Sequence, residues 1–192
     1  MEALFGIFSA FGLAASAGLN AYIPLLVIAL LARFTDLIHL TSPWDTLTSW
    51  WIIGLLLVLT LIEFFADKIP AVNHVNDIIQ TFFRPVAGAI AFAASAQVIT
   101  DVHPVLAMAA GLLIAGGVHT AKAVAIRPAV TATTGGAGNI PVSTTEDIVA
   151  TVTSIVSIVM PVLIICAIIV LTALILWYIW RRFNRERKSL QS

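Results

Sequence analysis

Long apolar runs separated by short polar connections make up most of the chain and predict membrane-spanning helices. The first run, from Ala3 to Ala32, contains no charged residue, and a helix needs only ~20 apolar residues to cross the hydrocarbon core of a bilayer. We therefore predict an all-α fold, a polytopic transmembrane helix bundle that forms a single domain over residues 1–192. About five spans are expected, near residues 4–33, 50–66, 85–100, 104–126 and 148–180.

Two of these runs contain residues that interrupt a helix. Gly18, Asn20 and Pro24 lie in the middle of the first run and predict a break or kink. Pro161 divides the last run in the same way. Breaks within a membrane are tolerated where the freed backbone groups face protein or a wet cavity, which is how many transporters build binding sites. A kinked helix that is simply closely packed is the alternative.

The segment between the second and third runs has an amphipathic pattern. Apolar residues recur at helical spacing over residues 71–84. This pattern predicts an amphipathic helix that lies at the membrane interface or dips into the bundle, and a surface helix joining two spans is the alternative. Its polar face carries Asn73, Asp77, Gln80 and Arg84.

Small residues and capping patterns define further features of the bundle. Glycines and alanines in the third and fourth spans predict that these two helices pack closely at its centre. A Gly- and Thr-rich segment from Thr131 to Pro141 predicts a flexible connection. Ser143 and Glu146 match a capping box, so the next helix is expected to begin near Ser143.

Composition excludes an ordinary soluble domain. The chain is 60% hydrophobic and 10% charged, with a mean hydropathy of +1.03, whereas soluble domains average roughly 45–50% apolar and about 25% charged residues. The net charge is zero, but basic residues crowd the tail at 181–192. This tail predicts a cytoplasmic C-terminus by the positive-inside rule, in preference to nucleic-acid binding. Five crossings would then place the N-terminus and the polar clusters outside, unless the first run enters the membrane and returns or the segment before Pro161 is re-entrant.

Charged and amide side chains lie within or next to the predicted spans. An ionisable group at bilayer depth is a functional-site hypothesis by default, because it must face protein, water or a partner of opposite charge. For the basic groups near the end of a span, snorkelling to the lipid headgroups is the alternative. The predicted substrate- or ion-binding residues are Asn20, Glu63, Asp67, Lys68, Asp77, Arg84, His119, Lys122, Arg127 and Asn139.

Short sequence echoes indicate an internal repeat. Arg84-Pro85 is echoed by Arg127-Pro128, and each pair follows a helix that ends in charged groups. Gly18-Leu19-Asn20 is likewise echoed by Gly138-Asn139. Paired interruptions at corresponding places are the best sequence indication of a transporter's central site. Because the matches are short, chance similarity is the alternative.

A set of short motifs runs through almost the whole chain. It comprises Ala17-Gly18-Leu19-Asn20-Ala21-Tyr22, Glu63, Asp67-Lys68, Pro70, Arg84-Pro85, His119, Lys122, Arg127-Pro128, Gly135-Gly136, Asn139 and Pro141. With these motifs the chain resembles a family of small bacterial inner-membrane proteins that is classed only as a domain of unknown function. The resemblance implies a multi-pass helical protein of the bacterial inner (plasma) membrane, and it implies no activity.

Three functions compete. In the first, a membrane transporter or lipid translocase, Glu63 and Asp67 carry protons or cations, and basic side chains neutralise them or hold an anionic head group. The second is a structural or assembly subunit of a membrane complex, in which the charges pair to fix the packing. The third is a membrane-embedded lipid-modifying enzyme with His119 as acid or base and with metal ligands drawn from Glu63, Asp67, His74 and Asp77. It ranks last because no HExxH, GxSxG or P-loop motif is present.

The leading hypothesis also sets the expected partners. No cofactor, bound metal ion or catalytic residue is predicted. The expected partners are membrane lipids together with a small ion, an anionic lipid or a metabolite. A homo-oligomer is also considered, and nucleic acid is not expected.

Overall fold

The computed structural model describes residues 2–96 and 102–189 of the chain, and the side chains of residues 5–69, 75–96 and 102–182. Within these ranges every regular element is a helix, which confirms the predicted all-α bundle. The elements in chain order are α1 (Glu2–Leu19), α2 (Ile23–Phe34), η1 (Trp44–Thr48), α3 (Trp50–Ala66), α4 (Pro70–Ala96), α5 (Pro104–Ala121), η2 (Lys122–Ile126), α6 (Arg127–Thr134), α7 (Asn139–Val159) and α8 (Pro161–Ser189).

Helix length and hydropathy identify the segments that fit a membrane. Among the described residues, four helices have the length and composition of a membrane span, and three other apolar helices are shorter. The shorter ones cover Phe5–Leu19, Ile23–Phe34 and Trp50–Ala66. The four long ones are Val75–Ala96, Pro104–Thr134, Asn139–Val159 and Pro161–Arg182.

The first apolar run forms two helices, α1 and α2, and residues near both ends of the run, Phe5 and Ile38, line one cavity. The run therefore enters the bundle and returns, so the single span predicted over residues 4–33 is wrong. Its break lies at the position that the Gly, Asn and Pro pattern predicts. At one end of α2, the Arg33 side chain donates to the Thr48 carbonyl oxygen at 2.7 Å, next to the start of α3. At the other end, the Ala21 N–H donates to the Glu63 carboxylate at 3.2 Å, near the end of α3. α2 and α3 are therefore antiparallel.

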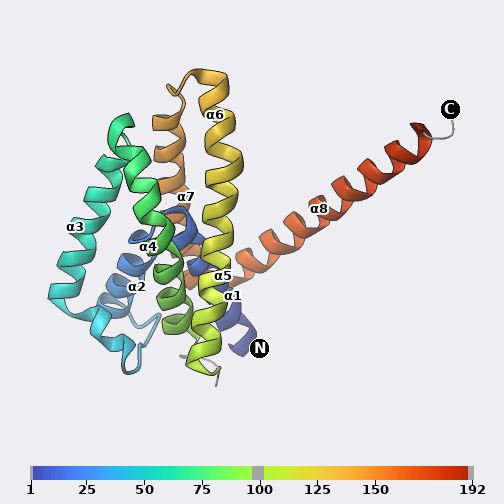
Figure 1. Cartoon of the computed structure of the whole chain (residues 1–192). Coiled ribbons are helices and arrows are strands. Elements are labelled where there is room, and N and C mark those ends of the chain that lie inside the picture. The colour runs from blue at the N-terminus through green and yellow to red at the C-terminus, as the bar shows by residue number, and fades with distance from the viewer. Residues whose placement is uncertain (1, 97–101, 190–192) are drawn as a thin grey trace.

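α4 packs on α5 and α1 at the centre of the bundle (Figure 1). A Cβ atom added at Gly111 would overlap the Gly88 carbonyl oxygen, and one added at Gly88 would overlap the Ala115 side chain. The two backbones therefore touch, as the small residues of these helices predict.

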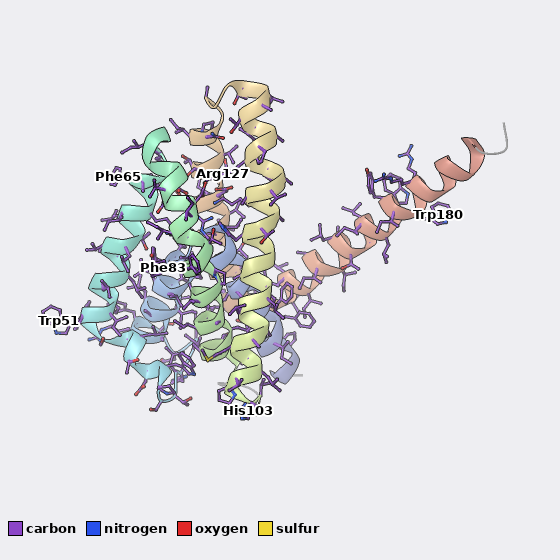
Figure 2. All side chains as sticks on the ribbon, viewed as in Figure 1. Trp51, Phe65, Phe83, His103, Arg127 and Trp180 are labelled. Carbon is purple, nitrogen blue, oxygen red and sulfur yellow. The ribbon has the colours of Figure 1, made fainter. Side chains whose placement is uncertain are left out.

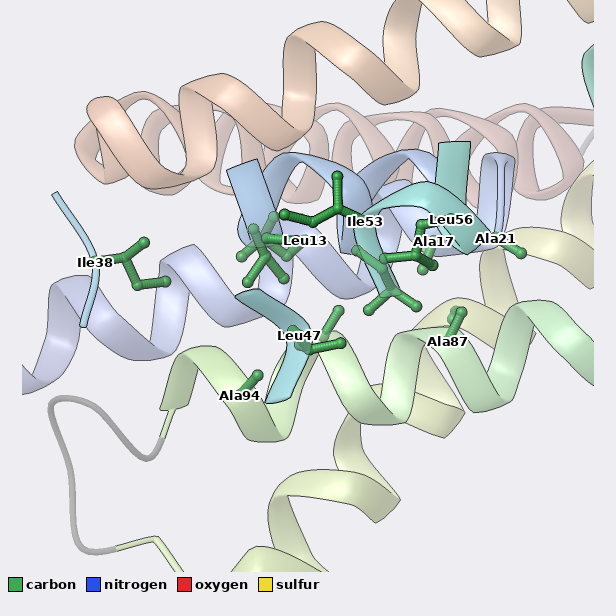
Figure 3. Close-up of a cluster of buried hydrophobic side chains, with 14 residues drawn as sticks. Leu13, Ala17, Ala21, Ile38, Leu47, Ile53, Leu56, Ala87 and Ala94 are labelled. Atoms are coloured by element: carbon green, nitrogen blue, oxygen red, sulfur yellow. The ribbon is translucent and has the colours of Figure 1, made fainter. Parts of the chain in front are cut away.

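Alanines and branched aliphatic residues fill the core around this contact (Figure 3). Leu13 and Ala17 of α1 lie in the same cluster as Ile53 and Leu56 of α3 and Ala87 of α4. The small α1 and α4 side chains allow close approach, and the larger α3 side chains fill the remaining space.

α4 continues through Pro85, so two predicted elements form one helix. The amphipathic helix expected over 71–84 runs directly into the span expected over 85–100, of which residues 97–100 lie outside the described residues. A proline removes one backbone hydrogen bond from a helix. Packing of α4 against both α1 and α5 maintains the helix at this position.

The polar face of α4 points into the bundle, so of the two predicted positions the helix takes the one inside the bundle and not the interfacial one. Asn76, Gln80 and Arg84 are 8%, 2% and 0% exposed, whereas Ile78 and Phe82 are 57% and 73% exposed. The helix is amphipathic as predicted, but its apolar side faces outward. Lipid satisfies apolar side chains, whereas the polar ones need partners from other helices.

The α6–α7 connection is shorter than the flexible segment predicted from Thr131 to Pro141. α6 extends through Thr134, and the turn after it contains Gly135 and Gly136 with φ of 61° and 92°. These positive φ values favour glycine.

α7 begins at Asn139, so the predicted start near Ser143 is wrong. The Ser143 hydroxyl donates to the Asp67 carboxylate at 3.4 Å, and Glu146 pairs with Lys122 at 2.6 Å. Both side chains of the expected capping box therefore bind residues of other helices. A tertiary contact has replaced a local one.

α8 begins at Pro161, so the span predicted over 148–180 is two helices, and the chain changes direction between them (Figure 1). The most apolar 18-residue window of the Pro161–Arg182 stretch has a mean hydropathy of 3.0, and only 6% of that window is buried. Figure 1 shows α8 extending away from the bundle, with its C-terminal end toward the same end of the molecule as α6. Such an apolar, uncovered helix is suited to contact with lipid.

Candidate functional site: a charged network at a helix break

Ionisable side chains from α3, α4, the α5–α6 helix and α7 meet inside the bundle. Within the described part of the chain, ion pairs join seven of these groups, and Lys68 and Asp147 form a further pair beside them; we call all nine the charged network. Figure 2 shows Trp51 and Phe65 pointing outward from α3, whereas Arg127 lies within the bundle. The network consists of Glu63, Asp67, Asp77, Glu146, Asp147, Lys68, Arg84, Lys122 and Arg127.

The pair formed by Glu63 and Arg84 is the most buried part of the network. Arg84 Nη2 lies 2.9 Å and Nε 3.3 Å from Glu63 Oε1, and both side chains are 0% exposed. Arg84 Nη1 lies 3.2 Å from His119 Nδ1. Because a guanidinium only donates, His119 Nδ1 accepts, and the opposite ring nitrogen, Nε2, is free to donate to the Thr81 hydroxyl at 3.1 Å. His119 therefore orients the arginine that holds Glu63.

Asp67 lies in the turn between α3 and α4 and joins two basic residues. Its Oδ2 lies 3.3 Å from Arg127 Nη2 and 3.7 Å from Arg84 Nη2, while Oδ1 accepts from Asn76 at 2.7 Å. Burial acts to raise the pKa of the Asp67 carboxyl, but the positive charges of Lys122, Arg84 and Arg127 outweigh burial and hold the pKa below its usual value. Asp67 is thus held ionised.

A π-helical turn brings Lys122 and Arg127 to the same carboxylate. Glu146 Oε2 lies 2.6 Å from Lys122 Nζ and 3.5 Å from Arg127 Nη2. The Arg127 N–H bonds to the Lys122 carbonyl oxygen, five residues back, as in a π-helix. An α-helix has 3.6 residues per turn and would turn these two side chains apart. Arg127 Nη1 also pairs with Asp77 at 2.8 Å.

The break between α1 and α2 lies against this network. The Leu19 carbonyl oxygen, at the end of α1, accepts from Lys122 Nζ at 3.3 Å. The Ala21 N–H, at the start of α2, donates to Glu63 Oε2 at 3.2 Å. A cation at a helix C-terminus and a carboxylate at a helix N-terminus both complement the helix dipole. The two ends of the broken helix are therefore each matched by an opposite charge.

Asn20 stabilises the break itself. Its Oδ1 accepts from the backbone N–H groups of Tyr22 and Ile23, each at 3.1 Å, and caps the start of α2. Its Nδ2 donates to Asp147 Oδ1 at 3.0 Å. One fully buried amide thus links the interrupted helix to α7.

The structure brings most of the predicted site residues together. Asn20 and His119 bind network residues directly, and the predicted charged residues are all members of the network. Asn139 lies apart at the start of α7, where its amide bonds to the Thr131 hydroxyl at 3.1 Å. Asn20 and Asn139 therefore have similar sequence surroundings but different contacts in the structure.

Several polar residues of the site escaped sequence reasoning. The capping-box pattern predicts a local role for Glu146, and the predicted site does not include Asp147, although two carboxylates at the start of a long apolar run indicate a site as Glu63 does. Asn76 lies on the face of α4 that carries Gln80 and Arg84, and its spacing of four residues from Gln80 is readable from the sequence. The sequence places Gln80 on this polar face but does not predict it as a site residue.

The metal ligands considered for an enzyme do not assemble in the part of the chain that is described. No group of three or more His, Cys, Asp or Glu side chains there is arranged to hold a metal ion. The His74 side chain lies outside the described residues.

Comparison with known proteins places the chain in a family. Neither the curated proteins nor the solved structures contain a match to it. The family described as Domain of unknown function (DUF4126) matches residues 7–181, a range that contains the whole charged network and the helix break. The predicted resemblance to a family of unassigned function is confirmed, and the chain belongs to the DUF4126 family.

Proposed function

We propose that this protein is a small membrane transporter coupled to protons or cations, with the charged network as its coupling site. The observation that carries the proposal is the α1–α2 break, where Leu19 and Ala21 offer backbone groups to Lys122 and Glu63. Transporters commonly use interrupted helices whose ends point at charged groups. In this chain the ends of the interruption are coupled to ionisable side chains.

Neutralisation of Glu63 provides a physical link between a bound proton and the shape of the bundle. The ionised carboxylate accepts from Arg84 and from the Ala21 N–H. A protonated carboxyl would bind both more weakly, because charge-assisted hydrogen bonds are roughly twice as strong as neutral ones. The arginine and the start of α2 would then be free to shift together.

Unpartnered oxygens supply further positions for a proton or a cation. Asp77 Oδ1, Gln80 Oε1 and Glu146 Oε1 are buried and have no hydrogen-bond partner among the described residues. Buried acceptors are normally satisfied, and orphaned ones call for an explanation such as a bound ion or water. Their position within or beside the network supports an ion or proton as the coupling species.

The second candidate function is a structural subunit, which the completeness of the ion pairing favours. Every member of the network has a partner of opposite charge within 3.5 Å. Buried charge pairs can fix the register of a fold without any transport. A transporter moves ions when its solute is added, whereas a structural subunit does not, so ion movement distinguishes the two functions.

The proposed orientation keeps the C-terminal tail in the cytoplasm. α8 leaves the bundle obliquely after α7, and its end lies toward the same end of the molecule as α6 (Figure 1). The network's basic residues would then lie toward the cytoplasmic side, in agreement with the positive-inside rule. This arrangement removes the conflict that five crossings produce. Membrane lipids and a homo-oligomer remain proposed partners.

Glu63→Gln is expected to abolish coupled proton movement. Liposomes that contain the protein and the pH dye pyranine would be given a membrane potential, with and without an extract of small cell metabolites outside. The wild type should move protons when the extract is added, because the extract supplies the unidentified solute. The variant should match protein-free liposomes, because its neutral amide cannot take up a proton.

Asp45→Asn is the matched control for this experiment. Asp45 is an exposed carboxylate of η1, outside the network, so its loss should leave proton movement unchanged. Proton movement by Glu63→Gln at the wild-type rate would remove Glu63 from the mechanism. Wild-type liposomes that respond no more than protein-free ones would overturn the transporter proposal in favour of a structural subunit.

A further inference from the structure

An apolar groove lies beside the charged network on the outer face of the bundle. It has a volume of about 320 Å³ and is lined by side chains of α2, α3 and α7. Ile23, Phe64, Ile148 and Val152 supply apolar walls. This volume is within the range of roughly 300–1,000 Å³ that is typical of ligand sites.

One ion pair of the network opens toward this groove. Asp147 lines it, and Asp147 Oδ2 lies 3.3 Å from Lys68 Nζ. The side chains of Lys68 and Asp147 are 19% and 11% exposed, whereas those of Glu63 and Arg84 are 0% exposed. A ligand in the groove can therefore reach Asp147, with Lys68 next to it, without opening the centre of the network.

The position of the pair along α3 matches the depth of a lipid headgroup. Trp50 and Trp51, at the start of α3, are 61% and 91% exposed and suit one membrane interface. Lys68 follows the other end of this 17-residue helix, which lies about 25 Å away at 1.5 Å per residue. The hydrocarbon core is about 30 Å thick, so Lys68 lies close to the opposite interface.

We infer that the groove binds a phospholipid whose headgroup carries a primary ammonium, such as phosphatidylethanolamine. One acyl chain lies against Ile23, Ile148 and Val152, the ammonium donates to Asp147, and the phosphate accepts from Lys68. Two adjacent opposite charges complement a zwitterion. This inference goes beyond the proposed transport function and does not depend on it.

The same chemistry discriminates between headgroups. A primary ammonium has three N–H donors for the Asp147 carboxylate, whereas the trimethylammonium of phosphatidylcholine has none. The anionic headgroup of phosphatidylglycerol pairs with Lys68 but leaves Asp147 facing a like charge. We expect phosphatidylethanolamine to bind roughly tenfold more tightly than either, the size of effect typical of one charge-assisted hydrogen bond.

Native mass spectrometry of the purified full chain, titrated with each of these three lipids carrying the same acyl chains, tests the inference. Asp147→Asn should reduce binding of phosphatidylethanolamine to the level of phosphatidylcholine. Val152→Trp should weaken binding of all three lipids, because its indole occupies the groove. Val159→Trp is the matched control on α7: Val159 is 49% exposed and does not line the groove, so wild-type binding is expected.

Three results would overturn the inference. The first is equal binding of the three lipids by the wild type, or a preference for the anionic lipid. The second is equal binding by Val152→Trp and Val159→Trp, which would place the lipid elsewhere. The third is a lipid-free dimer that Val152→Trp dissociates, which would show that a second copy of the chain covers the groove. This experiment measures lipid binding and not ion flux, so its outcome is independent of the liposome experiment.

Discussion

Arg84→Met is expected to destabilise the protein more than any other single substitution in the charged network. Arg84 is fully buried and is the closest basic partner of Glu63, at 2.9 Å. Methionine preserves much of the volume but leaves the carboxylate uncompensated, with Asp67 also losing a cation at 3.7 Å. Removing one partner of a buried ion pair costs about 3–5 kcal/mol. In a chain of this size that free energy corresponds to a fall in Tm on the order of 10 °C.

Thermal unfolding in detergent, followed by tryptophan fluorescence, measures this effect. The double variant Arg84→Met with Glu63→Gln should recover part of the lost Tm, because no isolated carboxylate remains at Glu63. Arg84→Lys should fall between the wild type and Arg84→Met, since lysine keeps the charge but loses the planar fork. A Tm for Arg84→Met within 2 °C of the wild type, a limit set at about 1 kcal/mol of stability, would show that the pair contributes little.

Gly111→Ala is expected to separate α4 from α5. A Cβ atom at this position would overlap the Gly88 carbonyl oxygen and come within 2.6 Å of Phe92 Cβ. One of these neighbours is a backbone atom and the other is a Cβ atom, so neither can move aside by a change of side-chain rotamer. Overpacking of this kind costs roughly 1–3 kcal/mol. The displacement also reaches the site, because Gly88 lies one helical turn after Arg84 on α4.

Gly117→Ala on the same helix is the matched control. A Cβ atom at Gly117 would have no neighbour within 4 Å, and alanine is favoured over glycine in a helix by about 1 kcal/mol. The Tm of Gly117→Ala should therefore equal or exceed that of the wild type, while Gly111→Ala should unfold several degrees lower. Equal Tm values for the two variants would contradict close backbone packing of α4 on α5.

Local patterns identified the helix ends that depend on backbone chemistry. Pro161 starts α8 as predicted, and the first run breaks beside Asn20. Pro85 is the exception: it lies inside α4 because contacts with α1 and α5 maintain the helix across it. Ser143 is a second exception, since its hydroxyl binds Asp67 from another helix and not its own backbone. A cap or a proline decides a boundary only where no stronger tertiary contact competes.

Sequence alone also selected most of the site, because a charge in an apolar run is conspicuous. Glu63 and Lys122 stand out as such charges, and Asn20 stands out as an amide at the predicted helix break. Their mutual arrangement was not readable, since it depends on which helices are neighbours and on a π-helical turn at Lys122. The sequence likewise does not show that Asp147 lines the groove, because residues of α2, α3 and α7 form the groove together.

The sequence by itself determined that this protein is a helical membrane-type bundle with charged groups among its apolar helices. Composition and hydrophobic pattern carry that information because lipid admits few charges and requires satisfied backbones. Only the tertiary structure decided that α4 turns its polar face inward and that the charges form one network around the α1–α2 break. Ion pairs are satisfied between helices, so the pairing follows from the packing of the whole bundle and not from any single segment.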